Sequence, residues 1–124
     1  MKKMIRIVKI LMIMLVFTFV FSGCTGRIEV RNTSEDTPIT SVMIIHQNQI
    51  SVTSEVVHTR RTPIRPGSRA SWRVSAEQGD GRGYIVAVEA LRDGVSGTAQ
   101  TWMFPVSWGG RMVVVFDGNR LYLQ

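Results

Sequence analysis

The chain has 124 residues, a single cysteine and a formal net charge of +6. Four of its cations, Lys2, Lys3, Arg6 and Lys9, lie near the N-terminus; beyond residue 23, eleven arginines face nine carboxylates, which leaves +2. A charge so close to neutral argues against a nucleic-acid-binding domain. The lone cysteine excludes an internal disulfide framework. The remaining length suits one domain with one core, burying roughly two-thirds of the surface that the unfolded chain exposes.

The N-terminal segment has the three zones of an export signal. Its cationic head is followed by an apolar run from Ile10 to Phe21, and the small residues Ser22 and Gly23 close it. The apolar run is well short of the ~20 residues that cross a ~30 Å hydrocarbon layer, which favours a cleaved secretory signal. The alternative is a permanent transmembrane helix, which would have to recruit Ile5 to Val8 across Lys9 and Arg6.

The end of this segment, Phe21-Ser22-Gly23-Cys24, resembles the lipobox of bacterial lipoproteins, in which an aliphatic residue and two small residues precede an invariant cysteine. Phe21 stands where the family usually has leucine. The resemblance implies acyl chains such as palmitate on Cys24, cleavage just before it, and attachment to a bacterial cell envelope. Because Thr25 is not the aspartate that favours inner-membrane retention, the resemblance implies the outer membrane in a Gram-negative organism. The alternative is that Cys24 is only a small apolar residue at the end of a signal.

Period-two alternation of apolar and polar residues predicts two strands after the cysteine. In Arg27–Asn32, Ile28 and Val30 share one face, which is typical of a half-buried strand. In Ile39–His46 the apolar residues occupy both faces. This second pattern predicts an interior strand that is covered on both sides.

The next alternation begins at Ile50 and runs to Val57. It is followed by a strong break over residues 62–67, in which Pro66-Gly67 suits the centre of a type II turn. A clean amphipathic strand then carries Trp72 on its apolar face, so Trp72 is expected in the core.

The rest of the chain predicts four more strands, with no helical apolar spacing. Asp93-Gly94 suits a two-residue hairpin turn, Trp102 is expected in the core, and Pro105 suggests an edge strand or a strand end. Glycine-rich segments and Asp117 mark the other turns. The predicted strands are Tyr84–Leu91, Trp102–Val106, Met112–Phe116 and Leu121–Leu123.

Seven or eight short strands with turn signals every eight to twelve residues favour an all-β fold, either a β-sandwich or a small barrel. Residues 30–34, 39–44, 64–68 and 84–88 follow an order similar to that in small immunoglobulin-like β-sandwich lipoproteins of bacteria, which mostly lack an assigned activity. The resemblance implies an antiparallel, immunoglobulin-like β-sandwich. The expected domains are a signal peptide over residues 1–23, a lipidated tether over 24–26 and the β-sandwich over 27–124.

Residues with catalytic or metal-binding chemistry are scattered. His46 and His58 fit no short metal-ligand spacing, and no serine lies in a Gly-x-Ser-x-Gly motif. Asp80 and Asp117 lie beside glycines, where turn formation explains them. The sequence therefore predicts a protein that is not an enzyme and has no metal or cofactor, with both histidines exposed or hydrogen-bonded on strands.

Two groups of residues are candidates for ligand binding. Five arginines crowd one segment. They suit anionic lipid headgroups, lipopolysaccharide phosphates or an acidic partner protein; the alternative is a solvated face that protects an edge strand. A tryptophan between serine and glycines suits a platform for a sugar ring, or a cap on the open end of a sandwich. The candidates are Arg60, Arg61, Arg65, Arg69, Arg73 and Trp108.

We therefore expect a lipid-anchored cell-envelope protein with a non-enzymatic structural or protein-interaction role. Its expected partners are the membrane, through lipidated Cys24, and an envelope protein or a glycan, but no nucleic acid. The alternative is a ligand-binding module for a glycan or anionic lipid headgroups. A hollow that contains Trp108 or residues 60–73 favours the ligand-binding module, whereas a flat surface favours protein contact.

Overall fold

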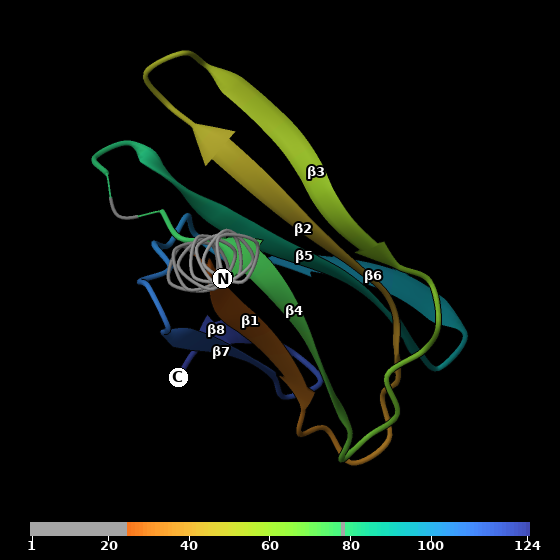
Figure 1. Ribbon diagram of the computed structural model, residues 1–124. Helices are drawn as coiled ribbons and strands as arrows, with labels where there is room; N and C mark the ends of the chain where they lie inside the picture. The colour runs from red at the N-terminus through yellow and green to blue at the C-terminus, as the bar shows by residue number, and fades with distance from the viewer. Residues whose placement is uncertain (1–24, 78) are drawn as a thin grey trace, which may run out of the picture.

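The computed structural model describes residues 25–77 and 79–124, and these form an all-β domain. The expected signal peptide and Cys24 lie outside the described residues. Two sheets of four strands, in the orders β4-β1-β7-β8 and β3-β2-β5-β6, face each other as the layers of a sandwich (Figure 1). The strands are β1 Thr25–Asn32, β2 Ile39–Asn48, β3 Thr53–Arg60, β4 Arg69–Ser75, β5 Arg82–Arg92, β6 Val95–Gln100, β7 Arg111–Phe116 and β8 Leu121–Leu123.

The core fills the space between the two sheets. Ile28 and Val30 of β1 are fully buried, as the alternation predicted, and so are the inward side chains of β5 opposite them. Burying such apolar surface contributes roughly 25 cal/mol per Å², which makes this inner layer the main source of stability. The inward β5 residues are Tyr84, Val86, Val88 and Ala90.

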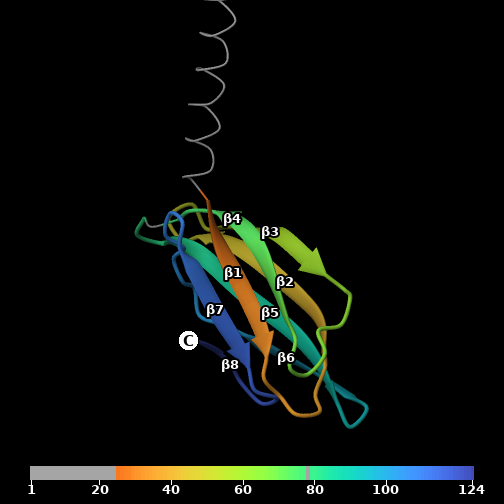
Figure 2. The ribbon, with the colours of Figure 1, turned by 60° about the horizontal axis from the view of Figure 1, so that its bottom comes forward.

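The sheets are not wholly antiparallel, which corrects the sequence-based expectation. β1 pairs with β7 in parallel, with Arg27 opposite Arg111 and Asn32 opposite Phe116. All other strand pairs are antiparallel. A parallel pair needs a long connection, and β1 and β7 lie side by side (Figure 2) although most of the domain's sequence separates them.

β1 begins earlier than the sequence indicated. Thr25 and Gly26, expected to belong to a tether, are paired with Ser75 and Val74 of β4. Gly26 is fixed there by close packing, since a Cβ atom on it would lie 2.3 Å from a side-chain carbon of Val106. The sandwich therefore starts directly after Cys24.

Two turns form as their residues predicted. The Ser68 amide donates to the Arg65 carbonyl across Pro66-Gly67 at 3.0 Å, with Gly67 at a φ of 81°. The β5–β6 hairpin closes through Asp93-Gly94, where both residues have positive φ. Positive φ at both central positions is the requirement of a type I′ hairpin turn.

The prediction that β2 is covered on both sides is wrong. Val42 and Ile44 face the core, but Met43 on the other face is 36 % exposed. Ile39 also faces the core, because the pairing with β5 shifts register between Ile39 and Ser41. The described chain forms only two layers, so nothing in it covers the outer face of β2.

The third strand begins and ends three residues later than predicted. β3 begins at Thr53, and Ile50 and Val52 lie in the turn before it, 74 % and 88 % exposed. The Asn48 side chain holds this turn by accepting hydrogen bonds from the Ile50 and Ser51 amides. Local turn chemistry at Asn48 thus overrides the alternation.

The predicted strand Trp102–Val106 is not a strand, and Trp102 is not in the core, since it is 91 % exposed. The segment instead makes two isolated bridges as it crosses between the sheets. Phe104 pairs with Tyr84 of β5, and Val106 pairs with Glu77, which follows β4. Thr101 turns inward because its backbone and side chain hydrogen-bond Val86, which leaves its neighbour Trp102 outward. Phe104 and Val106 are buried, as predicted.

Candidate functional site

The five arginines of the predicted segment belong to different elements. Arg60 ends β3 and donates to the Thr62 carbonyl at 2.9 Å, and Arg61 and Arg65 are exposed in the loop that follows. Arg69 and Arg73 point outward from β4, as predicted. Only these last two share a sheet face.

Their outward face carries three further arginines that the sequence analysis missed. Arg73, Arg27 and Arg111 stand directly opposite one another on β4, β1 and β7, and Arg69 stands opposite Arg31. The alternation of β1 put Arg27 and Arg31 on one face, but the register with β4 and β7 is set by long-range pairing. We define the arginine face as Arg27, Arg31, Arg69, Arg73 and Arg111 with Glu29 between them.

Glu29 is the acidic residue at the centre of the arginine face. Its side chain is only 6 % exposed; Arg31 approaches it at 2.6 Å, Arg69 at 3.7 Å and Arg111 at 3.9 Å. One carboxylate among five guanidinium groups leaves this face at +4, although the chain beyond residue 23 carries only +2. The arginine face therefore concentrates the positive charge of the domain, which attracts anions.

The outer face of the other sheet is apolar instead. Val56, Ile45 and Ile85 form one row across β3, β2 and β5, and Met43 stands opposite Ala87 in the next. We define the apolar face as these five residues. Val56 is 49 % exposed, and Ile45, Ile85 and Ala87 are half-buried.

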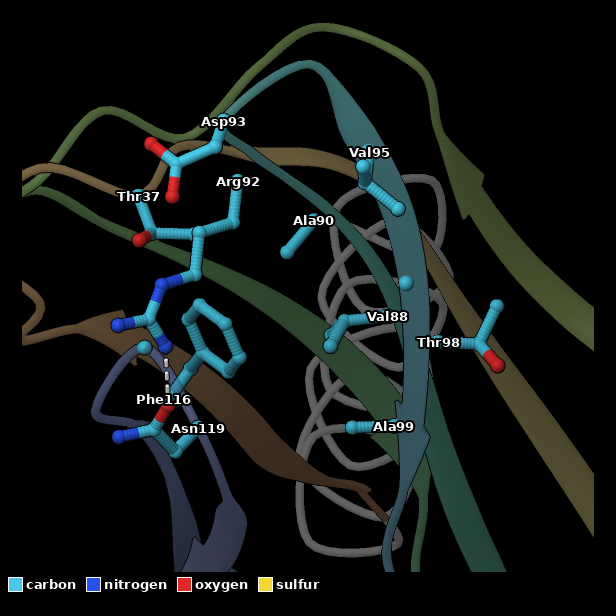
Figure 3. A pocket seen from close by; sticks show the side chains of 12 residues that line it. Thr37, Val88, Ala90, Arg92, Asp93, Val95, Thr98, Ala99, Phe116 and Asn119 are labelled. Carbon is cyan, nitrogen blue, oxygen red and sulfur yellow. Dashed lines mark hydrogen bonds between the residues drawn. The ribbon is translucent and has the colours of Figure 1, made fainter.

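A hollow of about 410 Å³ opens at the end of the sandwich opposite Thr25, between the β5–β6 hairpin and the turn before β8 (Figure 3). Val88, Ala90, Ala99 and Phe116 give it an apolar wall, and the Arg92 guanidinium donates a hydrogen bond to the Asn119 side chain beside it. Its volume lies within the ~300–1,000 Å³ of small-molecule sites. It contains none of the residues that the sequence analysis named for ligand binding.

Trp108 lies in an exposed turn, as predicted, and is 67 % exposed. The turn is closed by the Gly110 amide donating to the Ser107 carbonyl at 3.0 Å. The Gly109 amide also donates to the Thr25 carbonyl at 2.9 Å. The Trp108 turn is therefore tied by its backbone to Thr25, the first residue after Cys24.

Both histidines take part in strand contacts. His58 Nε2 lies 2.9 Å from the Arg73 carbonyl, joining the β3 edge of one sheet to the β4 edge of the other. His46 packs edge-on against Tyr84 and lies 3.3 Å from the Glu77 carboxylate. Residues 25–77 and 79–124 contain no cluster of metal-ligating side chains.

Tyr84 anchors this polar group inside the sandwich. Its hydroxyl donates to the Ser75 carbonyl at 2.6 Å. Burial, and secondly the Glu77 carboxylate, raise the pKa of Tyr84 to about 12. A phenol that stays protonated over the ordinary pH range is a structural donor at the edge of β4.

Asp117 is explained by turn formation, as predicted. Its side chain accepts hydrogen bonds from the Arg120 amide at 2.7 Å and the Asn119 amide at 2.8 Å. These backbone hydrogen bonds, that from Arg120 first, hold the pKa of Asp117 below its ordinary value. Asp80 is exposed in the loop before β5.

No protein-family model matches the chain, and no curated protein is similar enough to count as a match. In the part of the chain that the structure describes, no helix is long and apolar enough to cross a membrane.

Proposed function

We propose that this protein is a lipoprotein of the bacterial cell envelope, anchored through acyl chains on Cys24, whose β-sandwich acts by binding another envelope protein and not by catalysis. The lipobox-like sequence supports the anchor. The two packed sheets of four strands support placing the domain among the immunoglobulin-like sandwiches.

The observation that carries the binding role is the apolar face. Four of its five residues lie on β2 and β5, the two central strands of their sheet, whose inner faces already supply the core; Val56 extends it onto β3. An antiparallel sheet exposed on one side ordinarily alternates apolar inside with polar outside. Contiguous apolar side chains on the open side are typical of a surface that a partner covers.

Site-specific photo-crosslinking tests this role in cells. A photoreactive residue in place of Ile45 should give one discrete adduct with another protein, and Ile85→Lys should abolish the adduct because a charge in the contact lacks a partner. Thr98→Lys, on an exposed position of β6, is the matched control and should leave the adduct intact. Absence of an adduct, or an adduct equally sensitive to both lysines, would refute the protein-contact proposal.

The anchor is tested separately with Cys24→Ala. Acyl chains contribute ~0.8 kcal/mol per buried CH₂, and stable attachment takes two signals. The variant should leave the membrane fraction or accumulate as an unprocessed precursor. A variant that stays membrane-bound and is still cleaved normally contradicts the proposal.

A second candidate function is a ligand-binding module. The +4 charge of the arginine face favours anionic headgroups as the ligand, and the exposed indole of Trp108 suits contact with a glycan.

A further inference from the structure

A small hollow lies on the arginine face at the end where β1 begins. Its volume is about 160 Å³, well above the ~10–15 Å³ that one water molecule needs, so a group of five heavy atoms has room in it. Three side chains of one type, those of Arg27, Arg73 and Arg111, line it together with backbone of the Trp108 turn.

These three arginines repel one another across the hollow. They stand in one cross-strand row on three adjacent strands; in the antiparallel pair of Arg27 and Arg73, directly opposite Cβ atoms are about 4.5–5.5 Å apart. Like charges in such a row destabilise the sheet. An arrangement of this kind is favourable when an anion sits between the guanidinium groups.

The protein supplies little counter-charge of its own. Among the described residues, Arg27 and Arg73 have no ion pair, and Arg111 reaches Glu29 only at 3.9 Å. Glu29 is already held by Arg31 at 2.6 Å. The hollow therefore has three cationic walls and one distant, shared carboxylate.

We propose that this hollow is a binding site for a phosphate group. Each guanidinium offers a planar fork of donors that matches two phosphate oxygens, so three forks satisfy a tetrahedral oxyanion from three sides. Carboxylates fit less well, because their two oxygens lie in one plane and engage one fork at a time.

The position of the hollow points to the phosphate of a membrane lipid. Thr25 is one of its lining residues, and Thr25 directly follows Cys24 in the sequence. Acyl chains on Cys24 hold this end of the sandwich at the level of the neighbouring headgroups. Trp108, in the turn that borders the hollow, has the kind of side chain enriched at that level. The lipid source rests on the proposed anchorage; phosphate binding itself does not.

Inorganic phosphate is the first probe, titrated calorimetrically into the full-length chain in an uncharged detergent. The triple variant R27Q/R73Q/R111Q should bind phosphate at least tenfold more weakly. The control R61Q/R65Q/R82Q removes the same charge from exposed arginines outside the hollow and should change affinity less than twofold. R27K/R73K/R111K keeps the charge but loses the forks, and its affinity should fall between the two. Equal losses in the glutamine triples, or no saturable binding by the natural chain, would overturn the proposal.

Folding of the variants is checked by thermal unfolding without phosphate. The hollow triple, R27Q/R73Q/R111Q, should unfold at the same temperature as the natural chain or higher, because it removes the repulsion between the three guanidinium groups. Phosphate should raise the unfolding temperature of the natural chain and of the control R61Q/R65Q/R82Q most, that of R27K/R73K/R111K less, and that of R27Q/R73Q/R111Q least. A hollow triple that is stabilised by phosphate as strongly as the natural chain contradicts the site.

The source of the phosphate is decided in nanodiscs. In discs of phosphatidylglycerol the site should already be filled, so added inorganic phosphate should bind at least tenfold more weakly than in discs of a neutral glycolipid without phosphate. Equal binding in both discs overturns the lipid source and leaves a site for soluble phosphate. The detergent titration requires no membrane attachment. Phosphate binding can therefore be confirmed or refuted in it whether or not Cys24 anchors the protein.

Discussion

Asn32 is the buried polar residue at the end of β1, and its replacement by alanine should be among the most destabilising single changes in the domain. It is 1 % exposed. Its Nδ2 donates to the Thr37 and Ile64 carbonyls at 2.9 and 3.0 Å, and its Oδ1 accepts from the amide and hydroxyl of Ser34 at 3.1 and 2.5 Å. These bonds tie β1 to the loop that leads to β2 and to the segment before β4.

The magnitude follows from what each partner loses. The Ser34 hydroxyl has one hydrogen, which lies within reach of both Asn32 Oδ1 and Thr37 O, so in the variant it can turn fully to Thr37 O; Ile64 O keeps a hydrogen bond from the Ile39 amide. The Ser34 amide loses the acceptor that Asn32 gives it. Three bonds are lost outright and the fourth can be replaced, so at ~1 kcal/mol each the cost is roughly 3 to 4 kcal/mol, a large part of a typical stability of ~5–15 kcal/mol.

The assay is denaturant unfolding of the full chain in detergent, with Asn48→Ala as the matched control. Asn48 also caps a turn through its side-chain oxygen, but in an exposed position, so its loss should cost below about 1 kcal/mol. If Asn32→Ala costs as little as Asn48→Ala, the buried, hydrogen-bonded amide of Asn32 is not what stabilises the contact of β1 with these two segments.

Three further changes test individual side chains. Trp72→Ala should cost about 2 kcal/mol, less than the ~3–5 kcal/mol of a fully buried tryptophan, because Trp72 is only half-buried against the core. The control Trp102→Ala changes a 91 % exposed residue and should stay within ~0.5 kcal/mol of the natural chain. Equal losses of stability in the two variants would contradict the assignment of Trp72 to the inner face. The folded pKa of Tyr84 is raised from 10.0 to about 12, so its contribution to stability is complete below pH 10 and is lost as pH rises toward 12. In thermal unfolding measured across this pH range, Tyr84→Phe should remove that alkaline loss of stability. The control Tyr122→Phe should leave the loss in place. The folded pKa of Asp117 is lowered, so its contribution to stability is present above the ordinary value of 3.8 and is lost as pH falls below it. The difference in stability between the natural chain and Asp117→Asn should therefore disappear in acid. A difference that stays constant with pH would refute the role of the Asp117 carboxylate in this turn.

The inner layer of the sandwich was predictable because it is local. Tyr84, Val86, Val88 and Ala90 alternate without interruption, and each is buried. β6 was missed because Val95–Gln100 has no apolar alternation. That strand is stabilised by its antiparallel pairing with β5 and by the Asp93-Gly94 turn. Backbone pairing of this kind leaves no apolar alternation in the sequence from which it could be predicted.

The arginine face was only half predictable, for a similar reason. Arg69 and Arg73 were placed outward from their own strand alone. Arg111 joins them only through the parallel β1–β7 register, which connects residues far apart in sequence. Arg60, Arg61 and Arg65 illustrate the converse, because closeness along the chain did not place them on one face.

The two proposed surfaces lie on opposite faces of the sandwich, so we expect them to act independently. Side chains of the arginine face point away from one sheet, those of the apolar face point away from the other, and packed sheets are ~10 Å apart. Changes that far apart with no shared partner ordinarily add within ~0.3–0.5 kcal/mol, which is about a twofold change in affinity. Ile45→Lys should therefore leave phosphate affinity within twofold, and R27Q/R73Q/R111Q should leave the crosslink from position 45 intact. A loss of the crosslink in the arginine variant would mean that phosphate binding orients the domain for its partner, because a domain held only by its acyl chains is free to rotate on the membrane.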